Sequence, residues 1–232
     1  MKPLPSLVLF ARAPVLGSVK TRLSPPLSPR QVLALYAAFL EDAAGAYGSE
    51  ERWTPILAAE PDGDDPLLVR LFAPPWRRRG QAPGDLGARL TSAFAAEFAR
   101  GAPAVLAVGS DHPALPGERI EEAFDAVAAG SDAAIVPAED GGYCAIALSR
   151  RVEPGHVFRG VPWSTPRTLS ATRSNLEAGG HAVRTLASSY DVDRPGDLDR
   201  LRADLATRDA AAADFPAATA RALRELGRES RP

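Results

Sequence analysis

Five charged residues in four loops have side chains suited to phosphate and metal chemistry. Lys20 and Arg22 lie in a loop near the amino terminus, and Asp111, Asp140 and Asp193 each lie in a loop that follows an apolar run. An Arg side chain grips a phosphate with two parallel hydrogen bonds, whereas a Lys ammonium acts as a mobile point charge. Carboxylates together with substrate phosphates are the usual ligands of Mg²⁺. The residue types therefore predict a site for a metal-chelated polyphosphate, with Asp111 as its main metal ligand.

Lys20 is unusual in this chain, which contains 25 arginines and two lysines. An Arg bias of this size is most simply an effect of genome composition. A lysine in this loop therefore indicates that a compact, flexible ammonium suits the site. Together with Arg22 it would neutralise a pyrophosphate group as it leaves. The alternative is that the loop is a solvated surface turn.

Each carboxylate also has a structural alternative. Asp111 would shape a turn or cap a helix, and Asp193, with Asp191 beside it, would cap the helix expected after it. Asp140 would stabilise a tight Asp-Gly-Gly turn. All three loops follow predicted strands, and the carboxyl ends of parallel strands meet at one edge of a sheet. The loops would therefore converge if the sheet is mostly parallel.

Alternating strand and helix patterns supply the elements that would position these loops. Short apolar runs predict strands at 7–11, 53–59, 103–109, 132–137, 143–148 and 182–186. Capping residues and apolar residues at helical spacing predict helices at 28–45, 66–72, 88–100, 117–129, 166–178, 195–205 and 217–226. In the helix at 88–100, Asp85 is placed as the cap, and Leu86, Leu90, Phe94 and Phe98 form one core-facing stripe. This order predicts a three-layer α/β/α fold, in which helices cover both faces of a mostly parallel, mixed sheet.

Two strands should differ from the parallel pattern. Pro55 lacks an N–H group and moves the run 53–59 toward an edge of the sheet. The tight turn at 140–142 favours a hairpin, so the strand at 143–148 should be antiparallel. A chain of 232 residues fits one large domain, which we place at 1–207, followed by a helical tail at 208–232.

Composition narrows the function. A net charge of −2 argues against a general surface for nucleic acid, although the cluster at 77–79 is compatible with a phosphate contact or with a solvated edge. The lone Cys144 excludes an internal disulfide and a C-x-x-C motif, fits a reducing cytoplasm, and is expected in the core. No targeting segment and no apolar run of about 18 residues is present. We therefore expect a cytoplasmic protein without a membrane partner.

Several common catalytic signatures are missing. No G-x-G-x-x-G follows the first strand, which disfavours a dinucleotide site. The loop at 17–21 superficially resembles a P-loop, but that motif needs a glycine directly before the lysine, where this chain has Val19. No G-x-S-x-G elbow is present. His112 lies beside Asp111, but the chain lacks the further imidazoles that a His-type metal site needs.

Six segments, taken in order, resemble one known set of proteins. They are FARAP with GSVKTRL at 10–14 and 17–23, Q81 with GDLG at 84–87, GSDHP at 109–113, DGGY at 140–143, WST at 163–165 and DVD at 191–193. They look like the glycosyltransferase-A-like transferases often described as radical-SAM/selenodomain-associated transferase 1. That family is similar to nucleotidyltransferases such as the 2-phospho-L-lactate guanylyltransferases. The resemblance covers about residues 5–200 and implies the nucleotide-diphospho-sugar transferase fold, which is Rossmann-like, and a nucleotide donor.

The resemblance also implies roles for individual residues. The donor phosphates and base would be held by Arg12, Gly17, Lys20, Arg22, Gln81, Gly84, Asp85 and Gly87, the last four near the base. Asp111 would bind Mg²⁺ or Mn²⁺, and Asp193 would be the second metal aspartate. The segment from Asp193 is similar to the Asp-Thr-Pro-Glu-Asp-Leu of sugar cytidylyltransferases. This chain has Arg194 and Gly196 where that pattern has Thr and Glu, so Asp191 and Asp140 stay open as alternative ligands.

Three functions fit these patterns. The leading one is a metal-dependent nucleotidyltransferase, in which an acceptor phosphate or hydroxyl attacks the α-phosphate of a nucleoside triphosphate. A single Asp111 in place of the Asp-x-Asp of many glycosyltransferases favours it. The second is a glycosyltransferase with a nucleotide-sugar donor, in which Asp140 activates an acceptor hydroxyl and Trp163 stacks on a sugar. The third is a non-catalytic nucleotide-binding module. The patterns do not identify the small-molecule acceptor, the base or the oligomeric state.

Overall fold

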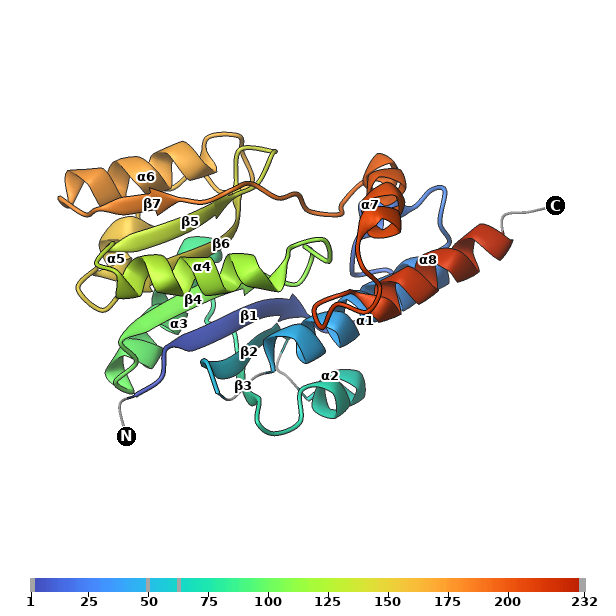
Figure 1. Cartoon of the computed structure of the whole chain (residues 1–232), viewed down its shortest axis with the longest axis horizontal. Helices are drawn as coiled ribbons and strands as arrows, with labels where there is room; N and C mark the ends of the chain where they lie inside the picture. The colour runs from blue at the N-terminus through green and yellow to red at the C-terminus, as the bar shows by residue number, and fades with distance from the viewer. Residues whose placement is uncertain (1–2, 49–50, 62–63, 230–232) are drawn as a thin grey trace.

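The chain forms a mixed sheet between two layers of helices (Figure 1). The computed structural model describes residues 3–48, 51–61 and 64–229. Within these residues seven strands lie in the order β3-β2-β1-β4-β6-β5-β7. Their bounds are β1 Ser6–Arg12, β2 Thr54–Glu60, β3 Arg77–Gly80, β4 Ala104–Gly109, β5 Ala133–Pro137, β6 Tyr143–Ser149 and β7 Val183–Thr185. The mostly parallel, mixed sheet that the sequence predicts is confirmed.

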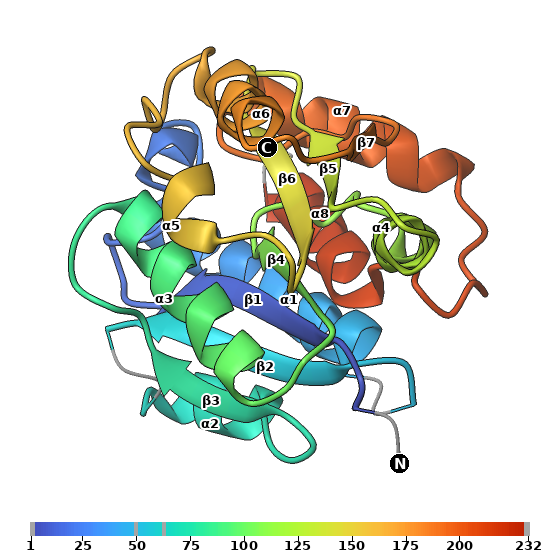
Figure 2. The ribbon, with the colours of Figure 1, turned by 90° about the vertical axis from the view of Figure 1, so that its left-hand side faces the viewer.

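Helices lie on both faces of the sheet (Figure 2). Two apolar clusters, one on each face, hold them in place. The larger cluster takes side chains from α1 (Pro29–Tyr47), α2 (Pro66–Leu71), α4 (Gly117–Ala128), α7 (Pro195–Thr207) and α8 (Ala217–Glu229). The smaller takes them from α3 (Leu86–Ala99), α5 (Pro154–Val157) and α6 (Thr168–Ala178). A short 3₁₀ helix, η1 (Thr21–Leu23), precedes α1. None of the described helices combines the length and the apolar character needed to cross a membrane.

β6 is the strand that departs from the parallel direction. It pairs antiparallel with both β4 and β5, while the other strand pairs are parallel. The tight turn at 140–142 connects β5 to β6, as the Asp-Gly-Gly sequence predicts. Because β6 runs in the opposite direction, it starts at the edge where β1, β4 and β5 end. This edge therefore collects the loops after β1, β4 and β5.

The strand that contains Pro55 lies next to the edge of the sheet, as the proline predicts, but it is not the edge strand itself. β2 lies between β1 and β3, and β3 was not expected as a strand. Pro55 pairs with Leu7 of β1, but on the other side the pairing with β3 begins one residue later, at Ile56. The missing N–H therefore falls where β2 has no partner on its β3 side. The edge position belongs to β3.

The arginines at 77–79 form this edge strand and bind nearby protein groups. Arg77 is paired with the buried Glu97, and Arg79 Nη2 donates to Ser92 Oγ at 3.2 Å. Arg78 Nη1 donates to the carbonyl of Phe72 at 3.2 Å. Charged residues on an edge strand prevent further strand pairing. The structure thus supports the edge alternative for this cluster.

α8 at the end of the chain is held on α1 through Asp42. Asp42 Oδ1 accepts a hydrogen bond from Ala218 N at 2.9 Å, and Oδ2 accepts one from Thr219 N at 2.8 Å. A carboxylate at this place satisfies two of the free N–H groups of the first turn and complements the helix dipole. Leu223 and Leu226, both buried, continue the contact along the helix.

We predict that Asp42→Ala lowers the free energy of unfolding by about 1–2 kcal/mol, because two helix N–H groups lose their acceptor. Denaturant unfolding followed by circular dichroism measures this difference. Glu41→Ala is the matched control, since Glu41 is half exposed and pairs with the exposed Arg221; its effect should stay below about 0.5 kcal/mol. Equal effects of the two changes would contradict the capping role.

Candidate functional site

Two adjoining cavities open at the edge of the sheet where β1 and β4 end. The larger has a volume of about 590 Å³ and the smaller about 300 Å³. Both are lined by Phe10, Leu86, Gly109, Asp111 and Ser164, so they meet next to the loop that follows β4. Leu86, expected on the core-facing stripe of α3, is instead 43% exposed and forms part of this shared wall. It lies at the first position of α3.

The loop after β1 brings Lys20 to Asp111. Val19 and Leu23 on either side of Lys20 are buried and anchor the loop in the core. Lys20 itself has a left-handed backbone, with φ of 46°, which costs about 1 kcal/mol for a residue other than glycine. Its Nζ lies 3.0 Å from Asp111 Oδ2 and 3.7 Å from Asp193 Oδ1. A strained and anchored backbone therefore holds the ammonium between two carboxylates.

The segment at 191–193 is fixed beside the same loop. Val192 is fully buried, and its N–H donates to the carbonyl of Asp111 at 3.0 Å. Asp193 Oδ2 accepts a hydrogen bond from Arg22 Nη1 at 2.7 Å. The first turn of α7 is capped by Asp197, which accepts from the N–H groups of Asp193 and residue 194 at 2.9 and 2.6 Å. The side chain of Asp193 is thus directed to Lys20 and Arg22 and does not cap α7.

Asp111 likewise does not cap a helix. Besides Lys20, its carboxylate contacts His112 Nε2 at 3.2 Å, and His112 Nδ1 lies 3.3 Å from the carbonyl of Tyr190. A side chain at Gly109 would come within 2.6 Å of Asp111 Oδ1, so the close approach of the carboxylate to the end of β4 requires glycine there. Glycine at this position leaves room for the carboxylate at the junction of the two cavities.

Charge interactions in this group shift the pKa values of both partners. Burial favours the neutral form of Asp111, but the Lys20 ammonium and His112 outweigh it and hold the pKa of this carboxyl well below its usual range. Burial lowers the pKa of Lys20, and the carboxylates of Asp111, Asp193 and Asp191 more than compensate, so its pKa is raised. Both groups are therefore charged at neutral pH.

The carboxylates of Asp111 and Asp193 fit a divalent cation that is shared with phosphates. Both approach one positively charged centre, the Lys20 ammonium, so their oxygens converge on one point. Across the residues that the structure describes, no group of three or more His, Cys, Asp or Glu side chains gathers for a metal. Two carboxylate ligands are sufficient for Mg²⁺ when substrate phosphates and water complete its octahedral shell. The donor set therefore fits Mg²⁺ or Mn²⁺ on a polyphosphate better than a metal held by protein alone.

The larger cavity contains two cations besides Lys20 and Arg22, namely Arg12, which only the resemblance placed here, and Arg89, which the sequence analysis missed. Arg12, Lys20, Arg22 and Arg89 line it, together with Glu60. The Arg89 guanidinium binds both carboxylate oxygens of Glu60, with Nη2 at 2.8 Å from Oε1. Arg89 was not expected here, although it lies three residues after Leu86 and so on the same face of α3. Tyr36 also lines the cavity, and its hydroxyl contacts the backbone of Arg12 and Ser110 Oγ.

The residues expected near a nucleobase lie in different places. Gln81 lines the larger cavity, and its Nε2 donates to the carbonyls of Ala11 and Ala58 at 3.0 and 2.9 Å. Asp85 caps α3 by accepting from Ala88 N at 2.8 Å, as its sequence position also predicts. Four predicted residues do not line either cavity, namely Gly17, Gly84, Asp85 and Gly87. Gly17 and Gly84 have positive φ angles of 75° and 107°, and Gly87 packs against Trp163.

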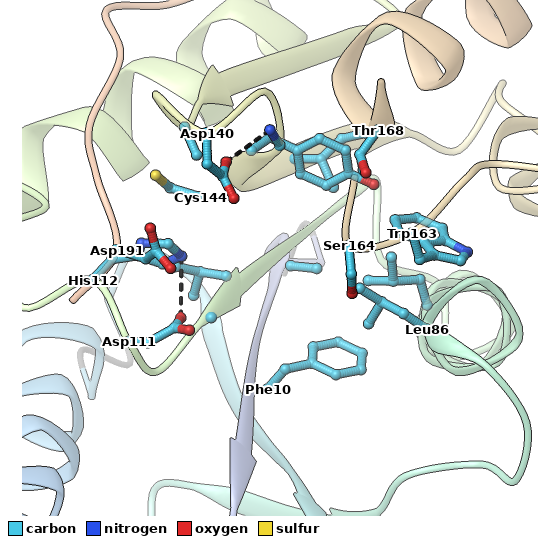
Figure 3. A pocket seen from close by; sticks show the side chains of 18 of the residues that line it. Phe10, Leu86, Asp111, His112, Asp140, Cys144, Trp163, Ser164, Thr168 and Asp191 are labelled. Carbon is cyan, nitrogen blue, oxygen red and sulfur yellow. Dashed lines mark hydrogen bonds and ion pairs between the residues drawn. The ribbon is translucent and has the colours of Figure 1, made fainter. Parts of the chain in front are cut away.

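The smaller cavity has a carboxylate wall and an apolar wall (Figure 3). Asp111, Asp140 and Asp191 lie on one side, and Trp163 and Leu86 on the other. Asp140 both lines the cavity and stabilises its own turn, since Oδ1 accepts from the N–H of residue 142 at 2.8 Å. Burial and the neighbouring Asp111 carboxylate raise the pKa of Asp191. Asp191, which the sequence offered only as an alternative to Asp193, therefore belongs to a different cavity.

The turn that carries Asp140 packs against the loop that carries Trp163 and thereby joins the two walls. A side chain at Gly141 would come within 2.4 Å of the Pro166 carbonyl, and its φ is 90°, so only glycine allows this contact. Ser164, next to Trp163, has a φ of 58°, a strained conformation that is typical of functional loops. The hydroxyl of Thr165 donates to the carbonyl of Pro162 at 2.8 Å and stabilises this turn.

Cys144 lines the smaller cavity but is protected as a thiol. Burial and the nearby carboxylates raise its pKa to about 12. The thiolate is therefore the minor form at every pH up to 10. At pH 8 the thiolate fraction of Cys144 is about a thousandfold lower than that of a free thiol.

We predict that iodoacetamide alkylates Cys144 at least about 100-fold more slowly in the native protein than in denaturant, with a rate that still rises between pH 8 and 10. A rate that levels off near pH 9, measured by mass spectrometry, would contradict this protection.

Comparison with known proteins places the chain among nucleotide-using transferase folds. A candidate nucleotide-diphospho-sugar transferase from Desulfovibrio desulfuricans G20 is 27% identical, with a TM-score of 0.85 over 96% of this chain and 95% of that one. A cytidylyltransferase from Leptospira borgpetersenii is 10% identical, with a TM-score of 0.60 over 99% and 98%. CMP:2-keto-3-deoxy-manno-octonic acid synthetase, solved with CTP, is 16% identical, with a TM-score of 0.51 over 88% and 98%. The last two likenesses concern the fold alone.

These comparisons agree with the fold that the sequence predicts. No curated protein gives a significant match to the chain. The nucleotide-diphospho-sugar transferase fold is confirmed, and the narrower resemblance to the radical-SAM/selenodomain-associated transferases stays a prediction. The sequence profile of DUF2064, described as an uncharacterized protein conserved in bacteria, matches residues 43–165 and includes β4, Asp111 and Asp140. The match covers more than half of this chain, and the chain therefore belongs to the DUF2064 family.

Proposed function

We propose that this protein is a metal-dependent nucleotidyltransferase, which transfers a nucleotidyl group from a nucleoside triphosphate to a small acceptor and releases pyrophosphate. The observation that supports this most is the meeting of Lys20, Asp111 and Asp193 in a cavity that also contains three arginines. A triphosphate carries several negative charges on a short chain. Cations on one side and a carboxylate-held metal on the other neutralise such a chain.

The residues of the larger cavity would have different roles in the reaction. Asp111 and Asp193 would hold the cation, which when bound supplies Lewis-acid stabilisation of charge on the phosphate oxygens. Lys20, released from its carboxylate partners, would neutralise the departing pyrophosphate, and Arg22 would bind it as a fork. Arg22 would be able to follow a leaving group once its ion pair with Asp193 opens, because its side chain is 68% exposed. Gln81 and Arg12 would face the rest of the donor.

Glycosyl transfer from a nucleotide sugar is the second candidate. Trp163 on the wall of the smaller cavity can stack on a sugar ring, and Asp140 lies opposite it to activate a hydroxyl. The description of the Desulfovibrio protein as a candidate nucleotide-diphospho-sugar transferase agrees with this alternative. The metal and phosphate residues would act in the same way in both reactions, with a nucleoside diphosphate as the leaving group here.

Product analysis separates the two reactions. The purified protein is incubated with Mg²⁺ or Mn²⁺ and each nucleoside triphosphate or nucleotide sugar, with a panel of acceptors. Release of pyrophosphate supports nucleotidyl transfer, and release of nucleoside diphosphate supports glycosyl transfer. Saturable nucleotide binding, measured by calorimetry, without turnover of any acceptor would contradict both and favour a non-catalytic nucleotide-binding module.

A further inference from the structure

The two cavities differ sharply in charge, although they share a wall. The larger contains four cationic side chains, Arg12, Lys20, Arg22 and Arg89, together with the carboxylates of Glu60, Asp111 and Asp193. Within the described part of the chain, neither Lys nor Arg lines the smaller cavity. Its acidic side chains are the carboxylates of Asp111, Asp140 and Asp191, and His112, which also lines it, has its Nε2 3.2 Å from Asp111 Oδ1. The change from surroundings of mixed charge to surroundings without Lys or Arg takes place at Asp111.

We infer that the acceptor in the smaller cavity is an uncharged or cationic small molecule with hydroxyl or amine groups, and not a phosphorylated one. This inference rests on the proposed function, in which the larger cavity binds the donor. A phosphate group would meet three carboxylates without a Lys or Arg partner, because the imidazole of His112 already contacts Asp111. A like charge in a partly enclosed site of this kind is strongly unfavourable. Hydroxyl and amine groups, by contrast, donate hydrogen bonds to carboxylates.

The shape and the opposite wall narrow the acceptor further. At about 300 Å³ the cavity has the size of a small-molecule site. Trp163 and Leu86 face the carboxylates across it, so one side of the occupant contacts apolar surface. A molecule with a C–H face and a polar edge of hydroxyl or amine groups fits both walls. Even when Asp111 shares a metal with the donor, Asp140 and Asp191 keep the carboxylate side of this cavity acidic.

The position of the cavities also defines the reaction that such an acceptor undergoes. Its hydroxyl oxygen forms a bond to the α-phosphorus, and the bond between that phosphorus and the oxygen leading to the β-phosphate breaks. The pyrophosphate leaves with the electron pair of that bond, and the hydroxyl proton passes to solvent. The product is a nucleotidyl ester of the acceptor, a phosphodiester. Donor and acceptor approach each other at Asp111, where the two cavities meet.

The charge of the cavity can be measured through Trp163. The chain has three tryptophans, and the other two, Trp53 and Trp76, are 4% and 6% exposed. Subtracting the fluorescence of Trp163→Phe therefore isolates Trp163. We expect iodide to quench it about threefold less than neutral acrylamide, after both are normalised to N-acetyltryptophanamide. The double variant Asp140→Asn, Asp191→Asn should raise iodide quenching by two- to threefold, with acrylamide quenching unchanged.

Glu118→Gln is the matched control, since this exposed carboxylate on α4 lines neither cavity and should leave both quenching constants unchanged. Equal quenching by iodide and acrylamide, or no response of iodide quenching to the double variant, would overturn the inference. The failure of nucleotides to bind, measured by calorimetry, would contradict the proposed function but would leave the quenching result valid. The two failures are therefore distinguishable.

Turnover with paired acceptors provides the direct test. Pyrophosphate release is measured in the presence of Mg²⁺ and each nucleoside triphosphate in turn. Three pairs of acceptors are compared: glucose with glucose 6-phosphate, glycerol with glycerol 3-phosphate, and ethanolamine with phosphoethanolamine. We expect any stimulation to come from the unphosphorylated member of a pair, by tenfold or more over its phosphorylated partner. Preference for a phosphorylated member would overturn the inference. If no pair stimulates release, the iodide result decides.

Discussion

Asp111→Asn is expected to lower the kcat/KM for the nucleotide donor by on the order of 10³-fold while leaving the chain folded. Asparagine keeps the shape of the side chain and one oxygen but loses the charge that pairs with Lys20 at 3.0 Å. If Asp111 is also the main metal ligand, the same change removes the charge that holds the cation on the phosphates. A loss of this size corresponds to about 4 kcal/mol of transition-state stabilisation. Pyrophosphate or nucleoside diphosphate release measures it with either donor class.

The control for this variant is Asp125→Asn, which removes one exposed carboxylate from α4 outside both cavities. Its activity should equal that of the wild type. Calorimetric titration with Mn²⁺ and the donor together gives a second readout, in which Asp111→Asn should bind the metal at least about tenfold more weakly. A folded Asp111→Asn protein that retains more than a tenth of the wild-type activity would remove Asp111 from the metal site.

Lys20→Ala should reduce kcat/KM for the donor by about 10²–10³-fold, because one ammonium no longer stabilises the leaving phosphates. The backbone strain at φ of 46° is similar for Ala and Lys, so the change acts mainly through the side chain. Lys20→Met tests the aliphatic stem separately and should lose as much activity. Kinetics at saturating acceptor, with thermal unfolding of each variant, separates the effects on turnover and on folding.

Lys20→Ala should also change the response to metal alone. The ammonium stands between Asp111 and Asp193, so its removal leaves two carboxylates without their shared cation. Mg²⁺ added without nucleotide should therefore raise the melting temperature of Lys20→Ala by more than that of the wild type. If Lys20→Ala loses activity and unfolding free energy in equal proportion, and Mg²⁺ does not raise its melting temperature more than that of the wild type, then Lys20 has a structural role only.

Local patterns predicted most elements of this fold. The cap at Ser28, with Gln31 completing a capping box, starts α1 at Pro29 as expected. Asp85 caps α3, and the turn at 140–142 reverses the chain into the antiparallel β6. These features depend on residues within one or two turns of each other. Their hydrogen bonds close locally, so sequence neighbours are sufficient to predict them.

Long-range packing decided what local patterns did not show. β3 is a strand only because β2 supplies its partner, and three arginines in a row have little strand preference of their own. Pro55 suggested an edge because the start of the β3 pairing, one residue later, is not visible in the sequence. Arg89 and Leu86 reach the site because α3 begins beside the loop at 163–165, a contact between distant segments.

The sequence by itself determined that charged loops follow the apolar runs, and therefore that cations and carboxylates lie beyond the ends of buried strands. Only the tertiary structure decided which of them meet. Lys20 contacts Asp111 and Asp193, which are 91 and 173 residues away, whereas Asp191, two residues before Asp193, lines the other cavity. The physical reason is that strand order and helix packing are cooperative properties of the whole core. They bring distant loops together at one edge and separate near neighbours on either side of the buried Val192.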